Sequence, residues 1–161
     1  MNAEELKKKA LNQKKSNKKL LGKLKKKKGT LIDELFQEAH DYIFSCTDCL
    51  KCANCCKTTG PLFTDKDIDR ISKHLNLKPI KFISQYLKID EDGDYVLQSI
   101  PCEFLGHDNY CSIYDVRPKA CLEYPHTNRK KQHQILKVNL KNTEICPAVF
   151  KIFEEIKSQN I

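Results

Sequence analysis

The sequence lacks several features that whole classes of protein require. No stretch approaches the roughly 18 consecutive apolar residues needed to cross a membrane, and the chain contains no tryptophan. It shows no glycine-rich phosphate loop, no recognisable Ser/His/Asp set and no motif of paired carboxylates. No apolar segment of a secretory signal follows the basic N-terminus. We therefore expect a cytoplasmic protein without a membrane span, and the sequence identifies no substrate.

The positive charge is concentrated at one end of the chain. The net charge is +8, but residues 1–30 contain twelve lysines and two acids, which leaves the remaining residues at −2. A segment so rich in lysine and so poor in apolar residues is usually solvated. We predict a lysine-rich disordered tail over residues 1–29 and a single domain over residues 30–158. Lys7–Lys28 could hold nucleic acid or another anionic surface weakly, although the tail has no aromatic residue to stack on a base.

Cysteine is the residue that the sequence has in excess. Five of the nine cysteines fall within the eleven residues Cys46–Cys56, at a spacing of about three. A disulfide framework would need an oxidising compartment and usually an even number of cysteines. A redox pair would need only one C-x2-C motif. Overlapping C-x2-C motifs, with more cysteines downstream, are typical of a metal or iron–sulfur site, and we favour that interpretation.

Eight thiols form the predicted ligand set. They suit two four-sulfur sites, or one cluster with spare ligands, and all-cysteine ligation suits Zn²⁺, Fe or a [4Fe-4S] cluster. The set is Cys49, Cys52, Cys55, Cys56, Cys102, Cys111, Cys121 and Cys146, with Cys46 as an additional candidate ligand. Because adjacent side chains point in different directions on most backbones, we expect Cys55 and Cys56 to serve either two sites or the two sides of one cluster.

A four-thiolate site with a divalent ion carries a net charge of −2. Arg117 is close in sequence to Cys121 and could offset this charge or donate hydrogen bonds to the sulfurs. It could equally form a salt bridge with Asp115 or Glu123.

The remaining pattern predicts a small α+β fold, mainly helical with short β elements, in which the metal contributes to stability. Apolar residues at helical spacing predict a helix over residues 31–44. Thr64 would cap a second helix, and Pro79 would open a third with Ile80, Ile83 and Leu87 inward. Strands are expected at residues 95–100 and 134–140, and a last helix is expected to begin at Pro147.

Several motifs in order resemble the CxxCxxCC, or YkgJ-like, cysteine-cluster family of zinc- or iron-chelating domains. They are Cys49-x2-Cys52-x2-Cys55-Cys56, Pro101-Cys102-x-Phe104-Leu105, Cys111-x-Ile113-Tyr114-x2-Arg117-Pro118-x2-Cys121-x2-Tyr124-Pro125 and Cys146-Pro147. Cys46 and the lysine tail depart from the family's pattern. The resemblance implies metal chelation by the eight matched cysteines. Flagellin lysine N-methylases share a similar cysteine pattern, so the resemblance also leaves a methyltransferase relation open.

Three functions therefore compete. The leading one is a metal-binding protein that chelates zinc or iron. The second is an iron–sulfur redox or protein-modifying enzyme. The third is a zinc protein that associates with RNA or the ribosome through the basic tail. The sequence does not indicate an oligomeric state.

Overall fold

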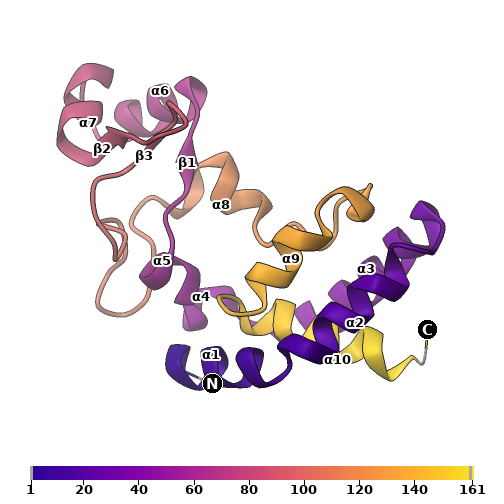
Figure 1. The fold of residues 1–161 in the computed structure, drawn as a ribbon. Coiled ribbons are helices and arrows are strands. Elements are labelled where there is room, and N and C mark those ends of the chain that lie inside the picture. Colours follow the sequence, from indigo (N-terminus) through magenta and orange to yellow (C-terminus); the bar gives the residue numbers. More distant parts are fainter. Residues whose placement is uncertain (1, 160) are drawn as a thin grey trace. The chain divides into compact units, whose positions relative to one another are not determined.

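The structure is a computed structural model that describes residues 2–159 and 161 (Figure 1). It divides into two compact units. Unit 1 combines the chain up to Asp48 with the chain from Pro125 onward, and unit 2 is the segment between them, Cys49–Tyr124. The fold is mainly helical with one small sheet, which confirms the predicted α+β class. No helix among the described residues combines the length and the apolar character needed to cross a membrane.

Unit 1 is built around the packing of two helices, α3 (Gly29–Phe44) and α10 (Pro147–Ser158). Their apolar faces meet at Phe36 and Phe153, whose rings pack edge to face at 6.0 Å between centroids. Apart from the adjacent pair Leu35 and Phe36, the buried residues of α3 recur every three or four positions, as the sequence predicted; they are Ile32, Leu35, Phe36, Ala39 and Ile43. The predicted inward face of α10 is also buried, since Val149, Ile152, Phe153 and Ile156 are fully inaccessible to solvent.

Residues 1–29 differ from the predicted disordered tail. They contain two helices, α1 (Ala3–Asn12) and α2 (Lys14–Leu24). The physical reason is that, apart from exposed Leu11, the leucines of these helices fall on one side of each helix and are buried. The buried apolar residues are Leu6, Ala10, Leu20, Leu21 and Leu24, and the three leucines of α2 belong to the same core cluster as α3 and α10. Sparse leucines are sufficient when another part of the chain covers them.

The segment predicted as a strand near residues 134–140 is helical, so that prediction is wrong. It contains a short 3₁₀ turn (Gln132–Gln134) followed by α9 (Leu136–Asn142). Buried Leu136 and Asn139 are three residues apart, which places them on one face of a helix. The Asn139 side chain donates a hydrogen bond of 2.7 Å to the Gln132 side chain, which fixes this face inside unit 1.

Unit 2 holds a three-stranded antiparallel sheet in the order β1-β3-β2. Its strands are β1 (Leu62–Phe63), β2 (Leu87–Ile89) and β3 (Tyr95–Leu97), so β3 is shorter than the predicted strand at residues 95–100. The acidic turn between β2 and β3 is closed by Asp90, whose carboxylate accepts hydrogen bonds of 3.0 Å from the backbone N–H groups of Asp92 and Asp94. This Asx-type turn explains why so acidic a segment forms a hairpin.

Two helices complete the core of unit 2. In α6 (Asp65–His74), Ile68 and Ile71 are buried, and Thr64 caps the helix as predicted. In α7 (Pro79–Tyr86), Phe82 is the buried residue, whereas Ile80 is 72% exposed, so the predicted inward face of this helix is wrong at that position. The error arises because α7 ends at Tyr86 and the chain enters β2 at Leu87, which changes the apolar period from helix to strand.

Candidate metal centre

The first four predicted ligands lie on two single-turn helices of unit 2. Cys49 and Cys52 are the first and last residues of α4 (Cys49–Cys52), and Cys55 and Cys56 lie on α5 (Asn54–Thr58). Between the helices, Ala53 has a φ of 47°, in the left-handed region that side chains other than glycine seldom adopt. This residue turns the chain, so the CxxCxxCC segment is not one continuous helix.

Cys55 and Cys56 bring their sulfurs close to each other. The two Sγ atoms lie 4.0 Å apart, near the edge of about 3.8 Å that a tetrahedron with zinc–sulfur bonds of 2.3 Å would have. The two sulfurs approach each other, and the assignment of the pair to two sites or to the two sides of one cluster stays a prediction. Both lie on α5, whose turn allows the two side chains to approach, and the pair has the spacing of two ligands of one ion.

The next two cysteines are carried by a loop that is fastened to α5. The backbone N–H of Cys102 donates a hydrogen bond of 2.8 Å to the carbonyl of Cys56. The loop then folds back on itself, with an isolated antiparallel bridge between Leu105 and Cys111 and a hydrogen bond of 2.8 Å from the Gly106 N–H to the Tyr110 carbonyl. Cys102 and Cys111 therefore lie on the two sides of one tight turn, next to α5.

Cys121 comes from a third element, α8 (Lys119–Glu123). Burial raises the pKa of its thiol to about 12, and negative charge on Cys56, Cys102 and Cys111 adds to the rise. Burial likewise raises the pKa of the Cys102 thiol to about 11, with contributions from Cys56 and Cys111. Negative charge on Cys56 raises the pKa of Cys102, Cys111 and Cys121 alike, which agrees with these thiols lying in one region of unit 2.

Cys56 behaves in the opposite way. A hydrogen bond from Cys55 lowers the pKa of the Cys56 thiol to about 7, against the effect of burial, and Lys57 contributes in the same direction. The pKa of Cys111 is raised, chiefly by burial. We call the five gathered side chains Cys55, Cys56, Cys102, Cys111 and Cys121 the thiol cluster.

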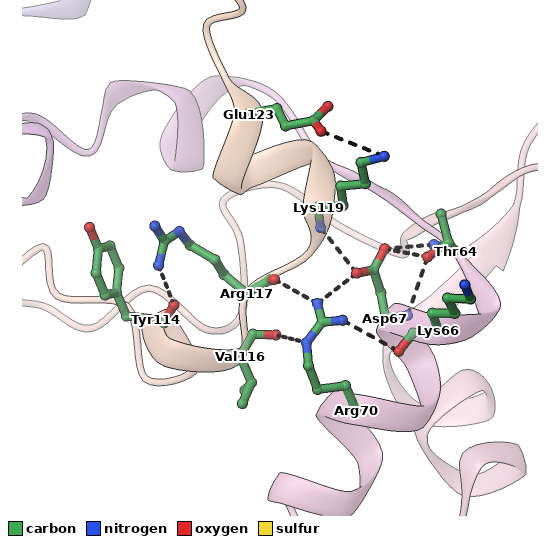
Figure 2. A network of polar contacts seen from close by, with 9 residues as sticks. All are labelled: Thr64, Lys66, Asp67, Arg70, Tyr114, Val116, Arg117, Lys119 and Glu123. Carbon is green, nitrogen blue, oxygen red and sulfur yellow. Dashed lines mark hydrogen bonds and ion pairs between the residues drawn. The ribbon is translucent and has the colours of Figure 1, made fainter.

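A network of polar contacts fixes the segment that carries Cys121 (Figure 2). Its centre is the carboxylate of Asp67, a side chain that is only 1% exposed. The carboxylate accepts hydrogen bonds from the Thr64 N–H at 2.9 Å and the Thr64 hydroxyl at 2.7 Å, which cap α6. It also accepts from the backbone N–H of Lys119 at 3.0 Å, at the first residue of α8. One carboxylate therefore joins the start of α6 to the start of α8.

Arg70 completes this network. Its guanidinium donates to Asp67 at 2.6 Å and to the backbone carbonyls of Arg117 at 2.8 Å and Val116 at 3.3 Å. Figure 2 shows the guanidinium lying between the carboxylate and these carbonyls. The 3₁₀ turn Tyr114–Val116, between Cys111 and Cys121, is thereby tied to α6. We call Asp67 and Arg70 the carboxylate clamp.

Arg117 lies close enough to two of the thiols for its charge to act on them, while its predicted role beside a metal stays a prediction. Its positive charge lowers the pKa of both Cys111 and Cys121, opposing the larger effect of burial. The guanidinium lies over the Tyr114 ring at 4.0 Å from the centroid and donates to the Tyr114 carbonyl at 2.7 Å. These contacts hold the Arg117 guanidinium beside the thiol cluster. Glu123, which the sequence offered as a salt-bridge partner for Arg117, pairs with Lys119 at 3.5 Å.

The other predicted ligands are placed differently. Cys49 and Cys52 belong to unit 2, while Cys46 and Cys146 belong to unit 1. Cys146 is the N-cap residue of α10 and packs against the core of unit 1. Cys46 is exposed, and its Sγ donates to the Ile43 carbonyl at 3.3 Å. Within residues 2–159 and 161, no group of three or more Cys, His, Asp or Glu side chains is arranged so that it could hold a metal ion as it stands.

Sequence reasoning missed the carboxylate clamp. The sequence contained part of the signal, because Thr64 was predicted to cap a helix and Asp67 stands three residues after it, at the spacing of a capping box. A capping carboxylate normally serves its own helix only. Nothing in the local pattern indicated that Asp67 would also accept from Lys119, fifty-two residues further along the chain.

The comparisons with known proteins agree with the cysteine pattern. No curated protein and no solved structure matches the chain. The family model CxxCxxCC, described as "Putative zinc- or iron-chelating domain", matches residues 48–147. This range is well over half of the chain, begins just before Cys49 and ends just after Cys146. The chain therefore belongs to the CxxCxxCC family.

Proposed function

We propose that this protein is a metal-binding protein that holds zinc or iron through cysteine thiolates. The observation that carries the proposal is the thiol cluster, in which three separate elements of unit 2 bring five sulfurs into one region. The donor set fits the ion, because thiolates are soft ligands that bind both zinc and iron. The family assignment supports metal binding independently of the geometry.

The proposed ligands are the eight cysteines of the family pattern. The thiol cluster supplies five of them, Cys49 and Cys52 lie on α4 of the same unit, and Cys146 enters the list through the family pattern alone. Cys46 lies outside the family pattern, and we assign it no structural part in the site. Arg117 would offset part of the negative charge of the bound thiolates, and the carboxylate clamp would hold α8 in place.

Bound metal would act mainly by joining these elements together. Burial raises the pKa of the Cys102 and Cys121 thiols to about 11 and about 12, so a metal ion must displace their protons when it binds. A divalent cation would replace the mutual repulsion of thiolates with attraction to one centre. Free energy of metal binding would then become free energy of folding for unit 2.

The test is metal analysis and a visible spectrum of full-length protein purified without oxygen. We expect bound zinc or iron in the wild type, retained in Cys46→Ser and reduced or lost in Cys121→Ser. Cys46→Ser is the matched control because it removes a thiol that is exposed and outside the family pattern. Wild-type protein that takes up neither Zn²⁺ nor Fe²⁺, or Cys121→Ser protein with undiminished metal, would overturn the proposal.

The same experiment separates the kinds of centre. Colourless protein with zinc indicates a mainly structural site. Brown protein that absorbs near about 400 nm and contains sulfide indicates an iron–sulfur cluster, and directs attention to redox or protein-modifying activity.

A further inference from the structure

The metal centre does not use the lysine-rich helices at the start of the chain. All twelve lysines between Lys7 and Lys28 are exposed. Two acids lie among residues 1–30, Glu4 and Glu5, and Glu5 pairs with Lys9 at 3.3 Å. We call the surface formed by Lys7–Lys28 the basic face.

The basic face is held on a folded support. Most apolar side chains of α1 and α2 are buried, namely Leu6, Ala10, Leu20, Leu21 and Leu24, and the lysines of both helices are left on the solvent side. The turn that follows α2 is also ordered by backbone hydrogen bonds, including Lys25 N–H to the Leu21 carbonyl at 3.0 Å and Lys27 N–H to the Leu24 carbonyl at 2.9 Å. The lysines therefore lie on helices that are already folded. Because the backbone is ordered before binding, less conformational entropy is lost when the lysines bind a partner.

Within α2 the lysines form rows. Lys15, Lys19 and Lys23 follow each other at intervals of four residues, which places them on one side of the helix about 6 Å apart along its axis. Lys14 and Lys18 form a parallel pair with the same spacing. Like charges four residues apart destabilise a helix. A partner that carries closely spaced negative charges would therefore reduce the repulsion between the lysines of these rows.

We propose that the basic face binds the phosphate backbone of nucleic acids without reading their sequence. A duplex presents one negative charge about every 1.7 Å along its axis, which suits rows of ammonium groups. Residues 1–30 contain neither arginine nor an aromatic residue. The basic face therefore lacks the bidentate guanidinium that reads guanine and the rings that stack on single-stranded bases. Point charges alone contact phosphates and confer no sequence specificity.

A membrane surface fits the basic face less well. A helix that lies in the membrane interface needs an exposed apolar face to insert between the lipids. In α1 and α2 the leucines that could insert between lipids are packed inside the protein instead. Their exposed fractions are at most 5% for Leu6, Leu20, Leu21 and Leu24. Leu11, at 47%, is the one large apolar side chain that these described helices expose. The proposal does not depend on the metal centre.

The experiment measures binding of full-length protein to fluorescent mixed-sequence duplexes of DNA and RNA by anisotropy, across a range of salt concentrations. The test variant replaces Lys14, Lys15, Lys18 and Lys19 with Gln. The matched control replaces four exposed lysines of unit 2 with Gln, namely Lys73, Lys78, Lys81 and Lys88, and so removes the same charge. A third variant replaces the four α2 lysines with Arg, and circular dichroism checks that each variant is folded.

We expect the wild type to bind both duplexes in a salt-dependent manner. The test variant should lose at least about tenfold in affinity, and the salt slope on DNA should fall by up to about 3.6, because each phosphate contact contributes about 0.9. The control and the Arg variant should remain within about twofold to threefold of the wild type. Absence of binding at low salt, or equal losses in the test and control variants, would overturn the proposal. Tighter binding to anionic phosphatidylserine vesicles than to either duplex would overturn it in favour of a lipid surface.

Discussion

Asp67 shows how one side chain links local and long-range structure. Burial opposes its charged form, but the hydrogen bonds from Thr64, Arg70 and Lys119 outweigh that effect and hold the pKa of the carboxyl below its usual value. The carboxylate therefore stabilises the fold only while it is charged. The same residue caps α6 and holds the first residue of α8, two positions before Cys121.

We predict that Asp67→Asn lowers the free energy of unfolding by about 2 kcal/mol at neutral pH, because it weakens charge-assisted hydrogen bonds to a buried acceptor. A carboxyl whose pKa is lowered on folding contributes stability above the unfolded pKa, here 3.8, and loses it as the pH falls through the folded pKa. Urea unfolding at several pH values should therefore show a shallower loss of stability in acid for the variant. Asp65→Asn, an exposed change in the same first turn of α6, is the control.

The prediction separates the clamp from general charge effects. If Asp67→Asn and Asp65→Asn changed the stability equally, or if the variant kept the acid dependence of the wild type, Asp67 would not have the role assigned to it. Arg70 is partly exposed, at 42% of its side chain, so the buried carboxylate is the more informative site to change.

At the scale of elements, α2 is one of the helices that the sequence alone did not predict. It contains a glycine at position 22, which weakens a helix because glycine has more conformational freedom to lose. A Cβ built at Gly22 meets nothing within 4 Å, so a methyl group would cause no clash. The position therefore reports whether α2 is folded as part of unit 1.

We predict that Gly22→Ala raises the free energy of unfolding by about 0.5–1 kcal/mol. The reason is that alanine restricts the unfolded chain while fitting the helix without strain. Urea unfolding followed by circular dichroism measures the change. Gly93→Ala is a useful contrast, because that glycine also has open space around it but has a φ of 85°, and alanine there should destabilise the β2–β3 turn. An unchanged stability in Gly22→Ala would indicate that α2 does not contribute to the cooperative fold.

At the scale of the whole molecule, the two units differ in their apolar cores. Among the described residues, the core cluster of unit 1 contains fourteen buried side chains around α3 and α10, whereas that of unit 2 contains eight. A small core provides less hydrophobic stabilisation, and metal ligation is a common way to make up the difference. Unit 2 also carries the whole thiol cluster, so the bound metal should matter most there.

We predict that removing the metal from loaded protein destabilises unit 2 more than unit 1. Hydrogen exchange followed by mass spectrometry, with and without a strong chelator, should show lost protection in α6, α7 and the sheet, while α3 and the middle of α10 keep most of theirs. Cys46→Ser protein serves as a control that should behave like the wild type. Equal loss of protection in both units would contradict a metal-dependent unit 2.

Much of this protein could be derived from residue order alone. The spacing of the cysteines determined the family and the donor chemistry, because ligand type and short-range spacing are properties of the chain itself. The helices at residues 31–44 and 147–158 and the cap at Thr64 were also predictable, since an amphipathic period and a capping box act over a few residues.

Only the tertiary structure decided which distant residues meet. It gathered Cys102, Cys111 and Cys121 beside α5, and it brought the Asp67 carboxylate to α8. It also determined the state of residues 2–29, where the leucines of α2 pack into the core that α3, α9 and α10 share. The same long-range packing made a helix of the chain at Leu136–Asn142, where the local pattern suggested a strand. These outcomes depend on contacts between residues far apart in sequence, which a local pattern does not record.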